Sequence, residues 1–137
     1  MENPNARAEA PTLRIARPTR DLHAARGFWV DAVGMETLWG KPDDEHGPAL
    51  LMAGFPGAGW HLELVLDPAA VPATEARSVE EQLVLYLGRE PQSTFIDALV
   101  AAGGRIIEAT GYWQRWGTTL IDPDGYRLVL SSRTWDG

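Results

Sequence analysis

Asp122-Pro123-Asp124-Gly125-Tyr126-Arg127-Leu128-Val129-Leu130 is the stretch that decides the fold. Pro123 fixes φ for a tight turn, and Gly125 can take the positive φ that ends it. After the turn, the aromatic residue and the two leucines alternate with Arg127 and Val129, which is the period of a half-buried strand. The stretch therefore predicts a turn followed by a strand that turns one face to the core.

A second copy of this pattern lies upstream, in Pro56-Gly57-Ala58-Gly59-Trp60-His61-Leu62-Glu63-Leu64. Both copies read glycine, aromatic residue, basic residue, Leu, any residue, Leu. Because side chains alternate across a strand, His61 and Glu63 fall on the face opposite the leucines, as Arg127 and Val129 do in the other copy. The chain is therefore predicted to contain two copies of one module, each closed by such a strand.

Each half repeats the order strand, helix and three strands, as judged from apolar periods of two and 3.6 residues. In the first half, the expected strands are 13–18, 35–39, 49–53 and 60–66, and the expected helix spans 22–33. In the second half, the expected strands are 82–87, 105–108, 117–121 and 126–130, with a helix that begins at Glu90-Pro91 and an aromatic loop at 110–116. Residues 1–137 are thus expected to form a single domain of duplicated halves, 12–66 and 81–132, joined by a linker at 67–80.

Composition bounds the function. A chain of 137 residues with 45% hydrophobic and 23% charged residues fits one globular domain with a substantial core. The net charge of −7 argues against nucleic acid as a partner. No apolar run is long enough to span a bilayer, and no targeting segment is recognisable, so we expect a cytoplasmic protein without a membrane partner. The absence of cysteine excludes disulfides and thiolate chemistry.

The two βαβββ halves and the final Asp-Pro-Asp-Gly strand resemble the vicinal oxygen chelate superfamily, which includes glyoxalase I, the bleomycin-resistance proteins and the extradiol dioxygenases. The resemblance covers about residues 12–132. It implies an α+β fold in which each half curls its four strands into a partial barrel around a concave cavity. It also implies a homodimer, since two chains of this size commonly cover each other's cavities in this superfamily.

Metal-dependent members of the superfamily hold a divalent ion with His, Gln or Glu from the first and last strands of each half. The resemblance carries those positions onto Arg14, Glu63, Gln82 and Val129. Arg14 is a permanent cation and Val129 has no donor atom, so the usual site is incomplete. A rearranged site of His61, Glu63 and Gln82 for Zn, Ni, Fe or Mn is the alternative to our expectation of no cofactor.

Arg14 and Glu63 are expected to meet where the ion usually lies, because a guanidinium and a carboxylate satisfy each other there. Either this pair only fills the cavity and holds the strands together, or Arg14 is available to an anionic or carbonyl-bearing ligand. Arg127, on the same face of the last strand, would add to a cationic lining.

The aromatic residues divide into core and candidate site. Trp29 lies on the helix stripe and is expected in the core, whereas Trp113 and Trp116 belong to the expected aromatic loop. That loop either provides a stacking wall for a planar or hydrophobic ligand or packs against the helix of the first half or a partner chain. The predicted ligand-binding set is Arg14, His61, Glu63, Gln82, Tyr86, Trp113, Trp116 and Arg127.

Two functions of different class follow from these residues. The first is a protein that binds a small molecule in the concave cavity without the usual metal and without chemistry. The second is a metal-dependent lyase, isomerase or dioxygenase, which His61, Glu63 and Gln82 permit. No catalytic residue is assigned, because no nucleophile–base arrangement or acid–base pair of carboxylates is recognisable. The first function is the one we predict.

Overall fold

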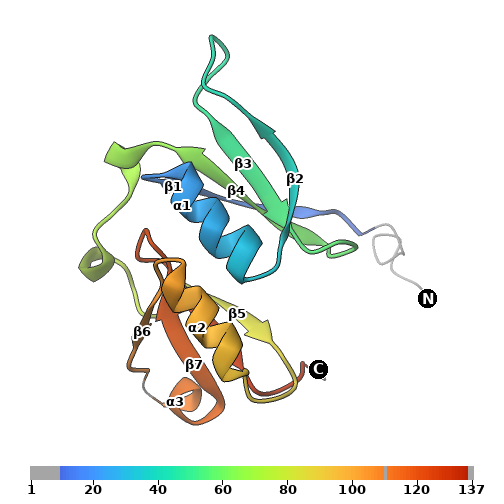
Figure 1. Ribbon diagram of the computed structural model, residues 1–137, viewed down its shortest axis with the longest axis vertical. Coiled ribbons are helices and arrows are strands. Elements are labelled where there is room, and N and C mark those ends of the chain that lie inside the picture. The colour runs from blue at the N-terminus through green and yellow to red at the C-terminus, as the bar shows by residue number, and fades with distance from the viewer. Residues whose placement is uncertain (1–9, 110, 136–137) are drawn as a thin grey trace, which may run out of the picture.

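The computed structural model describes residues 10–109 and 111–135, and Figure 1 shows two halves that each carry a sheet and a helix. The first half contains β1 (Leu13–Thr19), α1 (Leu22–Arg26), its π-helical continuation η1 (Gly27–Ala32), β2 (Glu36–Lys41), β3 (Leu50–Gly54) and β4 (Trp60–Leu66). The second half contains β5 (Gln82–Tyr86), α2 (Ser93–Ala101), β6 (Arg105–Ile107), α3 (Tyr112–Trp116), β7 (Gly117–Ile121) and β8 (Arg127–Ser131). The connecting segment holds two short 3-10 helices, η2 (Pro68–Ala70) and η3 (Thr74–Ala76).

The strands form two four-stranded mixed sheets, in the orders β1-β4-β3-β2 and β5-β8-β7-β6. β1 runs parallel to β4 and β5 runs parallel to β8, whereas the other neighbours are antiparallel. A parallel pair needs a crossover connection, which the helix of each half supplies. The predicted α+β fold of two βαβββ modules is therefore confirmed, and β1 and β5 lie at the edges of their sheets.

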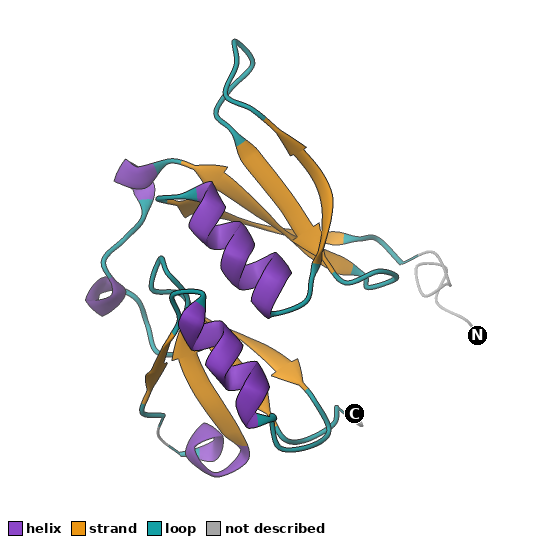
Figure 2. Cartoon of the chain, viewed as in Figure 1, coloured by secondary structure: helices purple, strands orange, loops and turns teal. Residues whose placement is uncertain are grey.

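The helices cover one face of each sheet and meet each other (Figure 2). The leucines predicted to point inward from the two closing strands, Leu62, Leu64, Leu128 and Leu130, are fully buried. Phe28 and Trp29 of η1 join the same core, so the interpretation of Trp29 as a core residue is confirmed. A Cβ at Gly104 would lie 2.8 Å from both the Leu99 carbonyl oxygen and the Phe28 ring. Glycine is therefore required where β6 begins, because the halves pack too closely there for a side chain.

Two helix boundaries differ from the sequence expectation. The helix expected from Glu90-Pro91 begins at Ser93, because the Gln92 carbonyl is the first to accept helical hydrogen bonds. The loop expected at 110–116 is wrong for 112–116, which form α3 after Gly111 turns the chain at a φ of 63°. Thr110 itself lies outside the described residues. Within the described part of the chain, no helix is long and apolar enough to cross a membrane.

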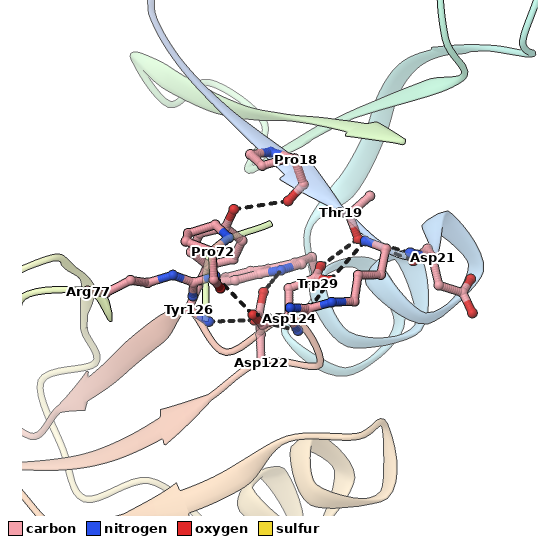
Figure 3. Close-up of polar contacts among 10 residues, drawn as sticks. Pro18, Thr19, Asp21, Trp29, Pro72, Arg77, Asp122, Asp124 and Tyr126 are labelled. Atoms are coloured by element: carbon pink, nitrogen blue, oxygen red, sulfur yellow. Dashed lines mark hydrogen bonds and ion pairs between the residues drawn. The ribbon is translucent and has the colours of Figure 1, made fainter. Parts of the chain in front are cut away.

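A polar cluster joins the two halves at the turn that precedes β8 (Figure 3). We call this cluster the inter-half lock, and its members are Thr19, Arg20, Trp29, Asp122, Asp124 and Tyr126. The Thr19 hydroxyl and the Arg20 backbone N–H donate to the two carboxylate oxygens of Asp124, the second over 2.9 Å. The Tyr126 hydroxyl donates to the Pro18 carbonyl at 3.0 Å. Each of these bonds crosses from one half to the other.

Asp122 is the most enclosed titratable member of the lock, with 3% of its surface exposed. Its Oδ2 accepts the Trp29 indole N–H at 3.0 Å, and its Oδ1 accepts the backbone N–H groups of Asp124 at 3.0 Å and Tyr126 at 2.8 Å. Burial is the largest influence and raises the pKa of Asp122 to about 6, although these hydrogen bonds oppose the rise. The predicted turn is confirmed, with Gly125 at a φ of 87°, but its carboxylates also hold the halves together.

Candidate functional site

The face of the first sheet that points away from α1 carries the residues expected in the first half of the site. Leu62 and Leu64 point to the helix, so His61 and Glu63 between them point to the opposite face. Strand register places Arg14 beside His61. Register also places Met52 beside Glu63, and Trp39 beside Met52. We call this surface the first outer face, defined by Arg14, Trp39, Met52, His61 and Glu63.

Arg14 contacts both polar residues of the β4 strand. Its Nε–H donates to His61 Nε2 at 3.3 Å, and its Nη1 lies 3.2 Å from Glu63 Oε2. The expected meeting of Arg14 and Glu63 is therefore present. The acceptor in the first bond is a ring nitrogen of His61, and in the second it is a carboxylate oxygen of Glu63. The Arg14 side chain is 51% exposed, however, so water reaches the pair and the dry setting assumed for a buried pair does not apply.

We expect the Arg14–Glu63 pair to contribute little to stability, because exposed ion pairs are typically worth about 0.2–1 kcal/mol. In a double-mutant cycle of Arg14→Met and Glu63→Gln, urea unfolding should give a coupling energy in that range. A coupling of about 3–5 kcal/mol, which is typical when one partner of a buried pair is removed, would show that the pair is shielded from water in solution.

The equivalent face of the second sheet is partly covered by α3. Gln82 and Tyr86 of β5 share this face with Val129 of β8. Trp113 packs over it, because a Cβ at Gly117 would lie 3.3 Å from the Trp113 ring, and its ring centroid lies 6.3 Å from that of Tyr86. We call this surface the second outer face, and it is defined by Gln82, Tyr86, Trp113, Thr119, Arg127 and Val129. Unlike the first outer face, the second outer face is partly covered by a helix of its own half, α3.

Two residues of the predicted ligand-binding set make contacts that turn them to other partners. Arg127 Nη1 donates to the Ser78 carbonyl oxygen at 3.3 Å. The guanidinium groups of Arg115 and Arg133 each lie over the Trp116 ring, 4.8 Å from its centroid. A ligand role for either residue stays a prediction, and any such role must compete with these contacts.

Sequence reasoning missed two aromatic residues on or beside the outer faces, Trp39 and Trp135, whereas Tyr112 lies in the predicted aromatic loop. Trp39 is exposed on the first outer face. Trp135 is 74% exposed and lies 5.9 Å from Tyr86, and Tyr112 lies 4.8 Å from Trp113, in both cases between ring centroids. A bulge in the β2–β3 register interrupts the simple alternation of side chains just before Trp39, so the sequence pattern did not place Trp39 on this face. Trp135 follows the last strand, where no period applies.

The single chain does not bring all the predicted residues together. Arg14, His61 and Glu63 form one group, and Gln82, Tyr86 and Trp113 lie on the other sheet. Among the described residues, no hydrogen bond or ion pair joins one outer face to the other. A cavity of about 490 Å³ lies instead between the halves, lined by apolar groups that include Ile15, Trp60, Leu85, Tyr86 and Phe95.

The residues at the metal-ligand positions do not fit a divalent ion. Arg14 fills one position with a cation that is already bonded to His61 and Glu63. Val129, at another position, is fully buried and apolar. Gln82 lies on the other sheet, so the rearranged set of His61, Glu63 and Gln82 does not converge within one chain. Within residues 10–109 and 111–135, no group of three or more His, Asp or Glu side chains could hold a metal ion.

Comparison with known proteins assigns the chain to a family. The YycE-like N-terminal domain model matches residues 13–65, and the YycE-like C-terminal domain model matches residues 80–132. Protein YycE of Bacillus subtilis is 30% identical over 128 residues, which cover 89% of this chain and 88% of YycE.

Solved structures share the fold of this chain. The crystal structure of B. subtilis YycE matches with a TM-score of 0.72 and 27% identity over 92% of each chain. Leishmania major glyoxalase I matches with a TM-score of 0.68 and 16% identity, over 91% of this chain and 88% of its own. TnmS3, an antibiotic-binding protein from Streptomyces sp. CB03234, matches with a TM-score of 0.60 and 23% identity, over 93% of this chain and 99% of its own. The chain therefore belongs to the YycE-like family, and its fold is shared by glyoxalase and bleomycin-resistance proteins.

Proposed function

We propose that this protein binds a small molecule on its outer faces without a resident metal ion. The observation that carries the proposal is Arg14, which replaces a metal ligand and is oriented by His61 and Glu63. A guanidinium has five N–H donors, and two N–H groups of Arg14 serve these neighbours. The remaining donors suit an anionic or carbonyl-bearing group of a ligand.

The surroundings of Arg14 support a ligand with a planar or apolar part. Trp39 lies on the same outer face, and Tyr86 and Trp113 line the second outer face. Aromatic walls around a few polar groups are the usual composition of a small-molecule site. TnmS3, described as an antibiotic-binding protein, has the same fold, which supports the proposal by analogy only.

Protein purified without chelator is expected to contain much less than one Zn, Ni, Fe or Mn per chain, and added ions should not raise its thermal midpoint.

A compound screen that follows tryptophan emission should find anionic or carbonyl-bearing ligands. Arg14→Met should weaken such a ligand by about tenfold or more, the effect of losing one hydrogen bond to a charged group.

Arg14→His is the matched variant for the metal question, since it restores an imidazole beside His61 and Glu63. This variant should gain Zn²⁺ affinity over the wild type, because three such side chains make a zinc site. One tightly bound transition ion per wild-type chain would contradict the proposal and favour a metal-dependent lyase, isomerase or dioxygenase.

We also propose that the protein is a homodimer. β1 and β5 are edge strands, and edge strands are usually covered. Leu13 on β1 is 60% exposed, and the apolar cavity between the halves opens beside Ile15 of the same strand. Light scattering should therefore give the mass of two chains, and Leu13→Lys should lower that mass. Val100→Lys, on the exposed side of α2, is the control and should leave it unchanged. A wild-type monomer across micromolar concentrations would contradict the dimer.

A cytoplasmic location stays a prediction.

A further inference from the structure

The apolar cavity between the halves adjoins a second cavity. Their volumes are about 490 and about 310 Å³, and Leu87 and Phe95 line both of them. The second cavity is also lined by Arg89, Pro91 and Gln92, from the loop between β5 and α2. We call it the Arg89 cavity. Because the two cavities share part of their walls, an apolar recess between the halves ends at a polar one.

The walls of the apolar cavity are side chains that the core leaves partly uncovered. Ile15 and Trp60 of the first half and Leu83, Leu85 and Phe95 of the second pack against the core but stay half-buried. None of the described residues that line this cavity is charged. Its volume lies within the range of roughly 300–1,000 Å³ that is typical of small-molecule sites. The cavity therefore suits an apolar group that enters between the halves.

Arg89 brings an unpaired positive charge to the polar end. This residue is exposed, and among the described residues its side chain has no partner in a hydrogen bond, an ion pair or a ring contact. Glu90 follows Arg89 in the chain but lines neither cavity. The side chain of Gln92 does not cap α2, so its amide N–H groups can donate elsewhere. A guanidinium and a carboxylate form paired hydrogen bonds, so this end suits a carboxylate.

We propose that the two cavities together bind a free carboxylic acid with an unbranched alkyl chain. The carboxylate lies at Arg89 and Gln92, and the alkyl chain extends past Leu87 and Phe95 into the apolar cavity. Burial of each methylene group there is favourable, because apolar surface leaves water. The inference does not depend on the proposed function, since Tyr86 is the only residue of the defined outer faces that lines either cavity.

The probes are sodium hexanoate and sodium octanoate, used below the concentrations at which they form micelles. Octanoate should shift the indole N–H resonance of Trp60, assigned with Trp60→Phe, in a saturable way. The resonance of Trp39, which lies on the first outer face, should not move. Octanoate should bind about 15-fold more tightly than hexanoate, the effect of burying two more methylene groups. Equal affinities of the two acids, or a shift of Trp39 instead of Trp60, would overturn the proposal.

Arg89→Gln tests the carboxylate end, because it removes the charge from an exposed loop residue and leaves the apolar walls unchanged. It should weaken octanoate by about three- to fivefold, as expected for an ion pair that water reaches. 1-Octanol has no charge, so it should bind the wild type and Arg89→Gln alike. Arg26→Gln is the control, since Arg26 is exposed on α1 and lines neither cavity. Octanoate binding by Arg89→Gln at wild-type strength would overturn the proposal.

Leu87→Trp tests the apolar end, because a larger side chain fills the place where the two cavities adjoin. It should weaken octanoate by about tenfold or more, with far-UV circular dichroism used to show that the variant is folded. Val79→Trp is the control, since Val79 is 63% exposed and lines neither cavity. Octanoate binding by folded Leu87→Trp at wild-type strength would overturn the proposal. If this variant does not fold, Arg89→Gln still decides.

A second copy of the chain is the other candidate for this space, because β5 is an edge strand. Light scattering at saturating octanoate distinguishes the two occupants. An unchanged mass supports the acid, whereas a mass that falls as octanoate is added would show that a partner chain fills the cavity and would overturn the proposal.

Arg14→Met separates this site from the proposed function. Octanoate binding that depends on Arg89 and not on Arg14 supports the acid site even if no ligand of the outer faces is found. Octanoate affinity that falls in Arg14→Met but not in Arg89→Gln would remove the acid site and leave the proposed function intact.

Discussion

Asp124→Ala is expected to lower the free energy of unfolding by about 1–3 kcal/mol for each buried donor that it leaves without a partner. The change removes the acceptor of the Thr19 hydroxyl and of the Arg20 backbone N–H, and the Thr19 side chain is fully buried. Both donors belong to the other half of the chain, so the loss falls on the contact between halves. Urea unfolding followed by tryptophan emission and by far-UV circular dichroism measures the effect.

Asp43→Ala is the control for this change, since Asp43 is exposed in the loop after β2. A substitution there should stay within about 0.5 kcal/mol of the wild type. Asp124→Asn keeps the volume and one acceptor oxygen, so it should fall between the two. Equal stability of Asp124→Ala and Asp43→Ala would show that the lock does not hold the halves together.

Because of Asp122, the free energy of unfolding is expected to fall as the pH rises. Its folded pKa of about 6 lies above the unfolded value of 3.8, so the folded state binds the proton more tightly. The stabilisation is complete below about pH 3.8 and is lost as the pH rises through about 6. The difference of roughly two pKa units corresponds to about 3 kcal/mol. The stability of the wild type relative to Asp122→Asn should therefore fall by that amount between pH 4 and pH 7.

Trp29→Phe is a second test of what determines the pKa of the Asp122 carboxyl group. It keeps an aromatic ring in the core but removes the indole N–H that donates to Asp122 Oδ2. Because that bond favours the charged form, its loss should raise the pKa of Asp122 further and extend the pH-dependent fall to higher pH. A flat difference between wild type and Asp122→Asn would show that the hydrogen bonds from Trp29, Asp124 and Tyr126 fully offset the effect of burial.

The sequence predicted the fold because the two closing strands carry a clear local pattern. Leu62, Leu64, Leu128 and Leu130 alternate with polar residues or valine, and all four are buried as expected. The same alternation placed His61 and Glu63 together on the other face. The helix at 112–116 carried no such signal, because one turn of helix is too short to show a period of 3.6 residues.

Other features of the site depend on contacts between distant segments. The exposure of Arg14 and the burial of Val129 beside α3 follow from how strands pair and how α3 packs. Aspartate is a typical turn residue, so the sequence around Asp122 and Asp124 did not reveal that their carboxylates also bind the other half of the chain. No local pattern distinguishes an aspartate that only shapes a turn from one that also binds the other half.

The bond between Thr19 and Asp124 joins residues that are 105 positions apart in the chain. Protein synthesis proceeds at about 5–20 residues per second, so Asp124 is made roughly 5–20 s after Thr19. After Leu66 has been made, the nascent first module has the residues of all its strands and its helix but still lacks the acceptor for its Thr19 hydroxyl. The apolar side of η1, which packs against the second half in the complete chain, is then open to other chains or to chaperones. The turn that contains Asp124 thus ends an interval, beginning during synthesis, in which the first module lacks its contacts with the second.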